Sequence, residues 1–296
     1  MKNKILNRHL KSNLGPKTLI LSMFLLMVLG CENDDTQTVA RSTTLVWEDN
    51  FNVDGTPDPN RWDYDLGDGT EQGIPGWGNE ELQYYTDRPE NATIQNGVLL
   101  ITAREESFEG FEYTSARLLT KDLFEQQYGR FEARIRLPFG QGIWPAFWML
   151  GADNDENPWP AAGEIDIMEY RGQEPTVLVG SVHGPGYFGG DAISKEFTLE
   201  NDRFDTGFHI FGIEWGPEFI NFYVDDVLYN QITPEDIEEE TDGEGIWVFE
   251  KPFFILMNLA VGGTFVGLPN AETQFPQTML VDYVRVYEFD ETLFTN

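Results

Sequence analysis

Short segments in which apolar and polar residues alternate restrict the fold of this chain more than any other feature. They begin at Leu45, are rich in aromatic and β-branched side chains, and are separated by Gly, Pro, Asn and Asp. The clearest segments are residues 97–103, 129–137, 208–215, 219–224, 253–259 and 279–287. A period of two is typical of strands that bury one face. No stretch keeps helical spacing for three turns with a cap at each end, so we expect many strands and little helix.

This pattern predicts an all-β domain over residues 44–296. The segment has no internal repeat and no second linker, which favours one β-sandwich, of the jelly-roll type, made of two large, curved antiparallel sheets. A curved sandwich leaves one concave face open. Because aromatic residues make up 14% of the chain, we expect an aromatic substrate cleft on that face, suited to a polymer chain.

The first 30 residues are typical of a bacterial secretion signal. Basic residues precede an apolar run over Leu19–Leu29, which is shorter than the ~20 residues that a membrane-spanning helix needs. The four residues that end at Cys31 resemble a lipobox, in which the cysteine is acylated. We therefore predict a lipoprotein signal peptide over 1–30, lipidation of Cys31 and a flexible acidic tether over 31–43. A cleaved signal followed by an incidental buried cysteine is the alternative.

These features predict a secreted lipoprotein of the outer membrane, exposed on the cell surface. The acidic stretch after Cys31 resembles the export tags of surface lipoproteins, and the periplasm or the medium are the alternative locations. Cys31 is the one cysteine of the chain, so no intrachain disulfide can form and stability must come from the core. The membrane is expected as a partner only through the lipid anchor.

The chain is strongly acidic, with a formal net charge of −32. Removing residues 1–30 would take away five Lys and Arg and no acidic residue, which leaves −37. Such a surface repels nucleic acid and heavily sulfated polysaccharides. A nucleic-acid partner is therefore not expected.

A strand with three acidic residues, within residues 162–170, is the sharpest local feature. Strict alternation would place Glu164 and Asp166 on one face and Glu169 on the other, beside two isoleucines. Burying a carboxylate there costs several kcal/mol unless it is paired or protonated. A β-bulge near residues 167–168 would return Glu169 to the face of the other two acids, and bulges are frequent next to active sites.

Two carboxyl groups on one face suit a retaining glycosidase, in which one attacks the anomeric carbon and the other protonates the leaving oxygen. Neighbouring negative charges raise the pKa of the least solvated carboxyl and keep it protonated for acid catalysis. From spacing alone, a solvated acidic strand or a cation site remains an alternative.

The chain resembles glycoside hydrolase family 16, in its β-1,3-glucanase (laminarinase) branch. The strand Glu-Ile-Asp-Ile-Met-Glu matches the bulged E-x-D-x-x-E motif of that branch. Other similar stretches are residues 77–86, 142–150, 183–187, 214–215, 256–263 and 281–287. The resemblance implies that Glu164 is the nucleophile, that Glu169 is the general acid/base, and that Asp166 tunes both of them.

The resemblance also implies residues that contact the sugar chain. They are Asn79, Glu80, Arg104, Trp144, Trp148, His183 and Asn258. An indole stacks well on a pyranose face, although Trp144 and Trp148 could instead belong to the sandwich core. A surface ion pair is the alternative role for Arg104.

Three of these residues are expected on opposite sides of the scissile bond. The loop with Asn79 and Glu80 is expected on the non-reducing side, and His183 on the leaving-group side, with a purely structural role as the alternative for the histidine. Asn258 is placed near the substrate by the resemblance only.

A structural Ca²⁺ is also implied by the resemblance, on the convex side of the sandwich. Its ligands would be the Asp282 carboxylate and backbone carbonyls near Glu48 and Gly97, and such hard oxygen ligands suit calcium. No catalytic cofactor is expected, because the three histidines of the chain show no ligand spacing.

Endo-hydrolysis of β-1,3-glucosidic bonds in laminarin-type glucans, with tolerance for mixed β-1,3/1,4 linkages, is the function that these features favour. A hydrolase of a red-algal galactan such as agar and a non-catalytic surface glucan-binding protein are the alternatives. The Trp-Gly-Asn-Glu-Glu-Leu-Gln loop at residues 77–83 counts against the first, and the presence of both glutamates against the second. We expect a monomer. An acidic, insertion-like stretch over 231–245 has no predicted position relative to the cleft.

Overall fold

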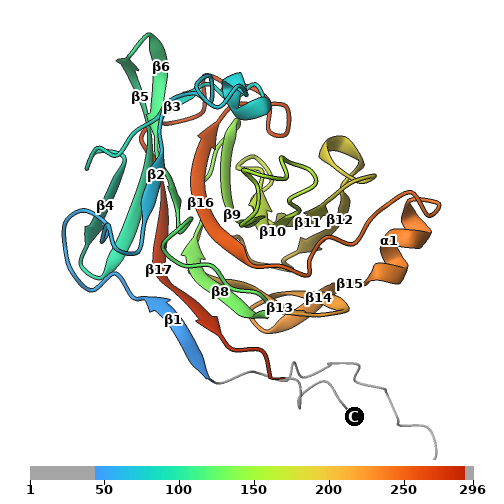
Figure 1. The fold of residues 1–296 in the computed structure, drawn as a ribbon. Coiled ribbons are helices and arrows are strands. Elements are labelled where there is room, and N and C mark those ends of the chain that lie inside the picture. Colours follow the sequence, from blue (N-terminus) through green and yellow to red (C-terminus); the bar gives the residue numbers. More distant parts are fainter. Residues whose placement is uncertain (1–43, 291–296) are drawn as a thin grey trace, which may run out of the picture. The chain divides into compact units, whose positions relative to one another are not determined.

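Two β-sheets form the framework of residues 44–290, the part of the chain that the computed structural model describes (Figure 1). The larger sheet contains β1 (Leu45–Asp49), β3 (Gln83–Tyr85), β4 (Ala92–Gln95), β5 (Val98–Phe108), β6 (Phe111–Ser115), β8 (Gly129–Arg136), β13 (His209–Gly216), β14 (Phe219–Val224), β15 (Val227–Ile232) and β17 (Gln277–Tyr287). The smaller sheet contains β2 (Asp63–Asp65), β7 (Arg117–Leu119), β9 (Ile143–Gly151), β10 (Glu164–Tyr170), β11 (Val177–His183), β12 (Ile193–Thr198) and β16 (Phe253–Val261). The predicted all-β sandwich is therefore confirmed.

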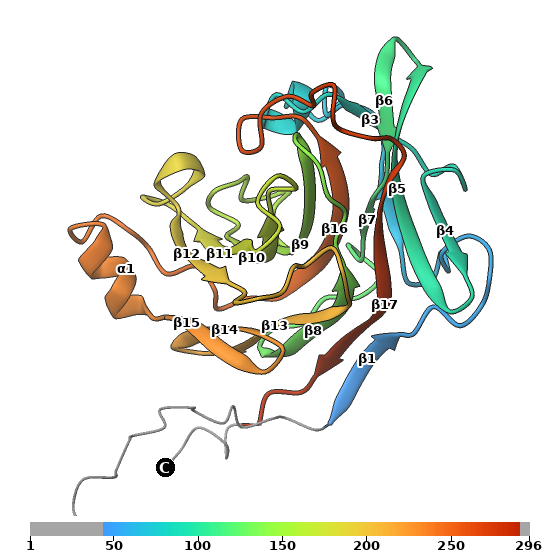
Figure 2. The same ribbon diagram turned by 180° about the vertical axis from the view of Figure 1, so that it is seen from behind.

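The smaller sheet has the order β12-β11-β10-β9-β16-β7-β2, and each neighbouring pair is antiparallel. It curves strongly, and the larger sheet covers its convex side (Figure 1, and from behind in Figure 2). Its concave side faces away from the larger sheet. One exception to the antiparallel pattern lies in the larger sheet, where β3 runs parallel to β6.

Alternation along the strands explains the core between the sheets. In β8, Phe131, Ala133 and Ile135 are completely buried in this core, whereas Glu132 and Arg134, which alternate with them, carry charged side chains. All nine residues of β16 are buried, because one face packs in the main core and the other lies under side chains of β9. A central strand that is covered on both faces has an almost continuous apolar sequence instead of an alternating one.

Helix is scarce, as predicted. One α-helix, α1 (Pro234–Glu240), begins at a capping box in which Thr233 and Asp236 bond to each other's backbone, and Pro occupies its first turn. Two short 3-10 helices, η1 (Pro75–Gly78) and η2 (Gly189–Asp191), complete the described elements. None of the helices in residues 44–290 is long and apolar enough to span a bilayer.

Candidate active site

A one-residue bulge interrupts β10 after Asp166. Between Asp166 and Glu169, β10 advances three residues while its partner β11 advances two. The pairing with β9 shows the same slip between Asp166 and Met168. The predicted bulge near residues 167–168 is therefore present.

The bulge sorts the side chains of β10 by polarity. Ile165 and Met168 are completely buried in the core between the sheets, and Ile167 is 2% exposed there. The bulge thus puts Met168, rather than Glu169, into the apolar layer. Glu164, Asp166 and Glu169 are left together on the concave face.

Asp166 is the most enclosed of the three acids, with 3% of its surface exposed. Its Oδ2 atom lies 2.9 Å from Nε2 of His183. Burial, together with the charges of Glu164 and Glu169, raises the pKa of Asp166 well above its usual range. One oxygen each of Glu164 and Asp166 and a ring nitrogen of His183 lie within 4.8 Å of one another, so their charges interact at close range.

Glu169 has the properties of a general acid. Burial raises its pKa to about 7; the His183 charge opposes this shift and the Glu164 charge adds to it. The indole Nε1 of Trp144 donates a 3.1 Å hydrogen bond to Glu169 Oε1, which favours the ionised form. A carboxyl that titrates near neutral pH can give and take a proton during turnover.

The ring of His183 is held from both sides. The Gly189 backbone N–H donates to Nδ1 at 3.0 Å, which leaves the other ring nitrogen to carry the proton that faces Asp166. Burial opposes the charged ring, but its bond to Asp166 and the surrounding carboxylates raise the pKa of His183 to about 9. The bond from Gly189 needs an unprotonated Nδ1, so it favours the neutral ring, opposes this shift and is present only in the neutral form. The structure therefore places His183 beside the acids and ties it to the loop after β11, and its expected contact on the leaving-group side stays a prediction.

Strand pairing arranges the concave face in rows that cross the sheet. One row runs from Glu169 through Ala146 of β9 and Asn258 of β16 to Arg117 of β7. At a strand spacing of ~4.8 Å, Asn258 lies about 10 Å from Glu169 and Arg117 about 14 Å from it. An extended chain that crosses the strands would follow such a row.

Trp144 and Trp148 lie on this concave face and not in the core between the sheets. Trp148 pairs with Asp166 across the strands, and its Nε1 donates to Asn258 Oδ1 at 2.8 Å. Trp144 is 9% exposed and packs on Phe265, at a centroid distance of 5.1 Å. Their expected stacking on sugar rings stays a prediction.

Two residues of the site were not predicted from the sequence. Arg117 stacks on Trp77 at 4.6 Å and on Trp148 at 4.7 Å, and it pairs with Asp65 at 3.0 Å. Burial raises the pKa of Glu81, and the Arg117 charge opposes that shift.

Glu81 is held by Asn79, Gln83 and Tyr85, whose side chains bond to its carboxylate at 3.2, 2.6 and 3.2 Å. Glu81, Gln83 and Tyr85 alternate along the sequence, and this alternation was the signal from which Glu81 could have been predicted as a site residue. Glu80 is exposed, with its backbone at φ 60°. Of the predicted pair, the structure brings Asn79 into the site, while the role of Glu80 stays a prediction.

Arg104 lies elsewhere among the described residues. It belongs to β5 in the larger sheet, and its Nε atom is 3.7 Å from Glu106 Oε1, which also pairs with Arg88. The structure thus gives Arg104 the surface ion pair that was its alternative role, and a substrate contact stays a prediction.

The residues expected to bind Ca²⁺ meet on the larger sheet. Register places Val281 opposite Leu99, so Asp282 lies next to the β4–β5 turn that contains Gly97, and β1 pairs with the later part of β17, where Glu48 lies opposite Arg285. The oxygen donors fit calcium in type. Arg134 bonds to Asp282 at 2.7 Å, and Arg61 donates to the Glu48 carbonyl, so positive charge already lies at these oxygens.

Cys31, the signal peptide over 1–30 and the tether over 31–43 lie outside the described residues, and so do residues 291–296. The predictions made for them are not tested by the structure.

Comparisons with known proteins show which family the chain resembles. Residues 79–285 match the family described as "Glycosyl hydrolases family 16". A beta-glucanase from Rhodothermus marinus is 45% identical over 275 residues, which cover 90% of this chain and 94% of that protein. The catalytic domain of an endo-1,3-beta-glucanase (laminarinase) from Thermotoga petrophila RKU-1 is 47% identical, with a TM-score of 0.79, over 84% of this chain and 99% of the other. The endo-beta-1,3-glucanase from Pyrococcus furiosus is 46% identical, with a TM-score of 0.79, over 85% of this chain and 99% of the other.

Proposed function

The chain belongs to glycosyl hydrolases family 16, and we propose that it is a retaining endo-glucanase that cleaves β-1,3-glucosidic bonds in laminarin-type glucans. It is a glycoside hydrolase, with relatives of that activity at 45–47% identity. The finer parts of the proposal are the roles of the individual residues, tolerance for mixed β-1,3/1,4 linkages, a calcium ion and a lipid anchor.

The bulge in β10 is the observation that carries the mechanism. It gathers Glu164, Asp166 and Glu169 on the concave face, while burial raises the pKa of Glu169 to about 7. A retaining enzyme needs an ionised nucleophile and a protonated acid beside the same sugar. Environment, rather than residue type, assigns these two roles to two glutamates of one strand.

The reaction proceeds in two steps. Glu164 attacks the anomeric carbon and forms a glycosyl ester, while Glu169 gives its proton to the departing glycosidic oxygen. Glu169, now ionised, then takes a proton from water, whose oxygen displaces Glu164 and restores the free carboxylate. Two inversions at the anomeric carbon give net retention.

Asp166 and His183 act on the reacting glutamates without reacting themselves. Asp166 lies between Glu164 and Glu169 along β10, and the charge of His183, which Asp166 contacts, lowers the pKa of Glu169. Gly189 fixes the ring of His183 through Nδ1.

On the other side of the acids, Trp148, Asn258 and Arg117 line the rows that lead away from Glu169. Aromatic faces and amide or guanidinium donors suit the neutral, hydroxyl-rich surface of a glucan. The net charge of −32 disfavours anionic polysaccharides. We propose the concave face as the substrate cleft.

A digestion panel tests this function. Laminarin, lichenan, carboxymethyl-cellulose, agarose and carrageenan are incubated with the protein and with Glu164→Ser, and the products are separated by size. A series of laminarin oligosaccharides from the wild type and none from the variant supports the proposal. Release of a single small sugar from the start would contradict endo action, and activity on agarose without laminarin would move the protein to the galactan hydrolases.

We further propose a structural Ca²⁺ held by the Asp282 carboxylate and backbone carbonyls near Glu48 and Gly97. The oxygen donor set on adjacent strands supports it. The ion would stabilise the convex side, and it takes no part in the reaction. Arg61 and Arg134, which bond to two of these oxygens, would turn away when the ion binds.

For the localisation, we propose an outer-membrane lipoprotein anchored at Cys31 and exposed on the cell surface, acting as a monomer. The basic, apolar and Cys-terminated N-terminal sequence supports the anchor. Cys31→Ser should move the protein from the membrane fraction to the soluble fraction. Equal partition of both forms would contradict the anchor, and protease treatment of intact cells separates surface from periplasmic exposure.

A further inference from the structure

Arg171 is the first residue after β10, and it lies on the same side of the smaller sheet as Glu169. Along this stretch Glu169 is on the concave face and Tyr170 is completely buried in the core between the sheets, so Arg171 returns to the concave face. Its guanidinium lies over the ring of Phe265, 4.1 Å from the ring centroid. The Arg171 side chain is 26% exposed, so water screens its charge only in part. A positive charge is therefore held two residues from the proposed general acid/base.

Phe265 connects this arginine to the hydrogen bond of the acid. Its ring is 5.1 Å from the ring of Trp144, whose Nε1 donates to Glu169 at 3.1 Å. A guanidinium is attracted to the face of an aromatic ring, which limits where it can go. A continuous line of contacts thus runs from Arg171 through Phe265 and Trp144 to Glu169.

The loop after β16 that carries Phe265 is tied to the rest of the site. The carbonyl of Val266 accepts hydrogen bonds from the side-chain amides of Gln141, at 2.6 Å, and Gln173, at 3.1 Å. Gln141 precedes β9 and Gln173 follows β10, so the loop is held by both strands that carry the indole and the acid. The ring of Phe265 is therefore a fixed support for its two neighbours.

On its other side Arg171 meets acidic side chains. Glu196 of β12 lies in the same row as Glu169, because both are aligned with Val179 of β11. The Nη1 atom of Arg171 is 3.6 Å from Glu196 and 3.1 Å from Glu174. The guanidinium therefore contacts an acidic residue in the row of the general acid/base as well as the aromatic pair beside it.

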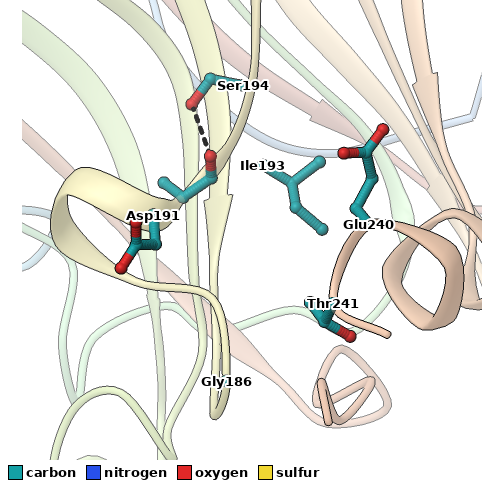
Figure 3. Close-up of a pocket in the computed structure, with 7 residues that line it drawn as sticks. Gly186, Asp191, Ile193, Ser194, Glu240 and Thr241 are labelled. Carbon is teal, nitrogen blue, oxygen red and sulfur yellow. Dashed lines mark hydrogen bonds between the residues drawn. The ribbon is translucent and has the colours of Figure 1, made fainter. Parts of the chain in front are cut away.

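The β12 edge of the smaller sheet carries more acidic side chains. Where the loop after β11 meets α1, a pocket of about 390 Å³ is lined by Asp191, Ser194, Glu240 and Thr241 (Figure 3). The Tyr187 hydroxyl of that loop donates to the Ile246 carbonyl at 2.9 Å. In both overall views α1 lies at the β12 end of the molecule (Figure 1, Figure 2). The acidic stretch over 231–245, whose position the sequence left open, therefore adds negative charge to this edge.

Charged groups face Glu169 from β10 and β11, while β9 contributes a neutral indole. Glu164, Asp166 and Arg171 come from β10 and its end, and His183 comes from β11. Burial raises the pKa of Glu169, the His183 and Arg171 charges lower it, and the Glu164 charge adds to the rise. His183 contacts Asp166 at 2.9 Å, so a change there would alter two groups at once. Arg171 is therefore the cation whose effect on Glu169 can be measured separately.

We propose that Arg171 is a positioning residue for the general acid/base. Its charge, and its contact with the indole through Phe265, keep Glu169 able to ionise when it has given its proton away. The second step of the reaction needs this ionised form, because Glu169 must then take a proton from water. Arg171 acts through its neighbours and does not react. This role rests on the proposed glucanase function.

Profiles of kcat/KM against pH on laminarin test the role, for the wild type, Arg171→Gln, Arg171→Lys and Arg203→Gln. Loss of the charge raises the pKa of Glu169, so the alkaline limb should move to higher pH by about half a pH unit in Arg171→Gln. Arg171→Lys keeps the charge and should stay closer to the wild type. Arg203 is the matched control, because it stacks on Phe139 at 4.7 Å and pairs with Asp205 at 2.8 Å in the loop between β12 and β13.

An unmoved limb in Arg171→Gln would overturn the role, and so would an equal movement in Arg203→Gln. A purely structural arginine would lower Tm and kcat at every pH, and a substrate contact would raise KM, in each case without moving the limb. Phe265→Leu is the second variant, since it removes the support of both the guanidinium and the indole. It should move the limb in the same direction as Arg171→Gln.

A carbon-13 NMR titration of the glutamate carboxyls measures the same pKa without substrate. The Glu169 signal is identified by its absence in Glu169→Gln, and its pKa should be higher in Arg171→Gln than in the wild type. Equal values would count against the role. A wild type that hydrolyses no laminarin would instead refute the glucanase function, while the titration would still report the effect of Arg171 on Glu169.

Discussion

The different chemical roles proposed for the two glutamates of β10 follow from what surrounds each of them. Burial raises the pKa of Glu169 to about 7, while Trp144 and His183 pull it down. Asp166 contacts Nε2 of His183, and the other ring nitrogen of that histidine accepts a hydrogen bond from the Gly189 backbone N–H. At the scale of single residues, the site is thus a balance between desolvation, which favours protonated carboxyls, and hydrogen bonds, which favour ionised ones.

Glu169→Gln removes the general acid and is expected to lower kcat/KM on laminarin about 10²- to 10⁴-fold. An aryl glucoside with an acidic phenol needs no proton to depart, so its first turnover should survive as a burst. Azide, which needs no general base, should then restore turnover as a glycosyl azide. The exposed Glu90 offers the control, Glu90→Gln. If Glu169→Gln lost equal activity on laminarin and on the aryl glucoside, and azide restored none of it, another residue would have to be the general acid.

Trp144→Phe should move the alkaline limb of the pH–rate profile to higher pH. The indole bond favours ionised Glu169, so its removal raises the pKa of that group and keeps the acid protonated further into the alkaline range. Trp148→Phe is the matched control, because its indole bonds to Asn258 instead. Profiles of kcat/KM against pH decide the matter, and a limb that moves to lower pH in Trp144→Phe would contradict the assigned role of the bond.

At the scale of elements, the bulge in β10 converts a sequence that does not alternate into a strand with one acidic and one apolar face. Deleting Ile167 alone leaves Glu-Ile-Asp-Met-Glu, which alternates without a bulge and keeps the three acids on one face. Loss of its buried side chain should cost about 2–4 kcal/mol. Deleting Ile167 and Met168 together turns Glu169 into the core.

The single deletion is therefore expected to fold with a lowered Tm and to keep measurable activity on laminarin. The double deletion should lose activity completely, or fail to fold, because it buries a carboxylate without a partner. Thermal unfolding and the digestion assay, run on both proteins, make the comparison. If the single deletion were as inactive as the double one, the bulge would be needed to set the distance between the acids along β10, and not only to bring them to one face of the strand.

The strands and the bulge were predictable from sequence because both follow from the period of apolar residues. The conflict between alternation and a buried glutamate was visible in Glu164 to Glu169 before any coordinates. Arg117 was not predictable, because its partners Trp77 and Asp65 come from separate loops and strands that only the sheet order brings together. The same holds for the contact between residues 185–187 and Ile246.

At the scale of the whole molecule, the sandwich has no disulfide and depends on its core and, as proposed, on one Ca²⁺. A chelator should lower the Tm by about 5–10 °C relative to calcium at 100 times its Kd. Asp282→Asn should remove this difference, and Asp155→Asn, at an exposed ion pair with Lys121, should keep it. Thermal unfolding with and without calcium gives the answer, and a Tm that does not respond to chelator would refute the ion.

The pairing of the first described strand with the last one governs when the molecule can fold. Leu45 lies opposite Tyr287, and β17 also separates β5 from β8 in the larger sheet. Contacts this distant in sequence make folding slow, on the order of milliseconds to seconds. A growing chain cannot close its larger sheet until the last strand has been synthesised. Such a delay leaves the polypeptide unfolded during the interval in which a secretion channel would have to thread it.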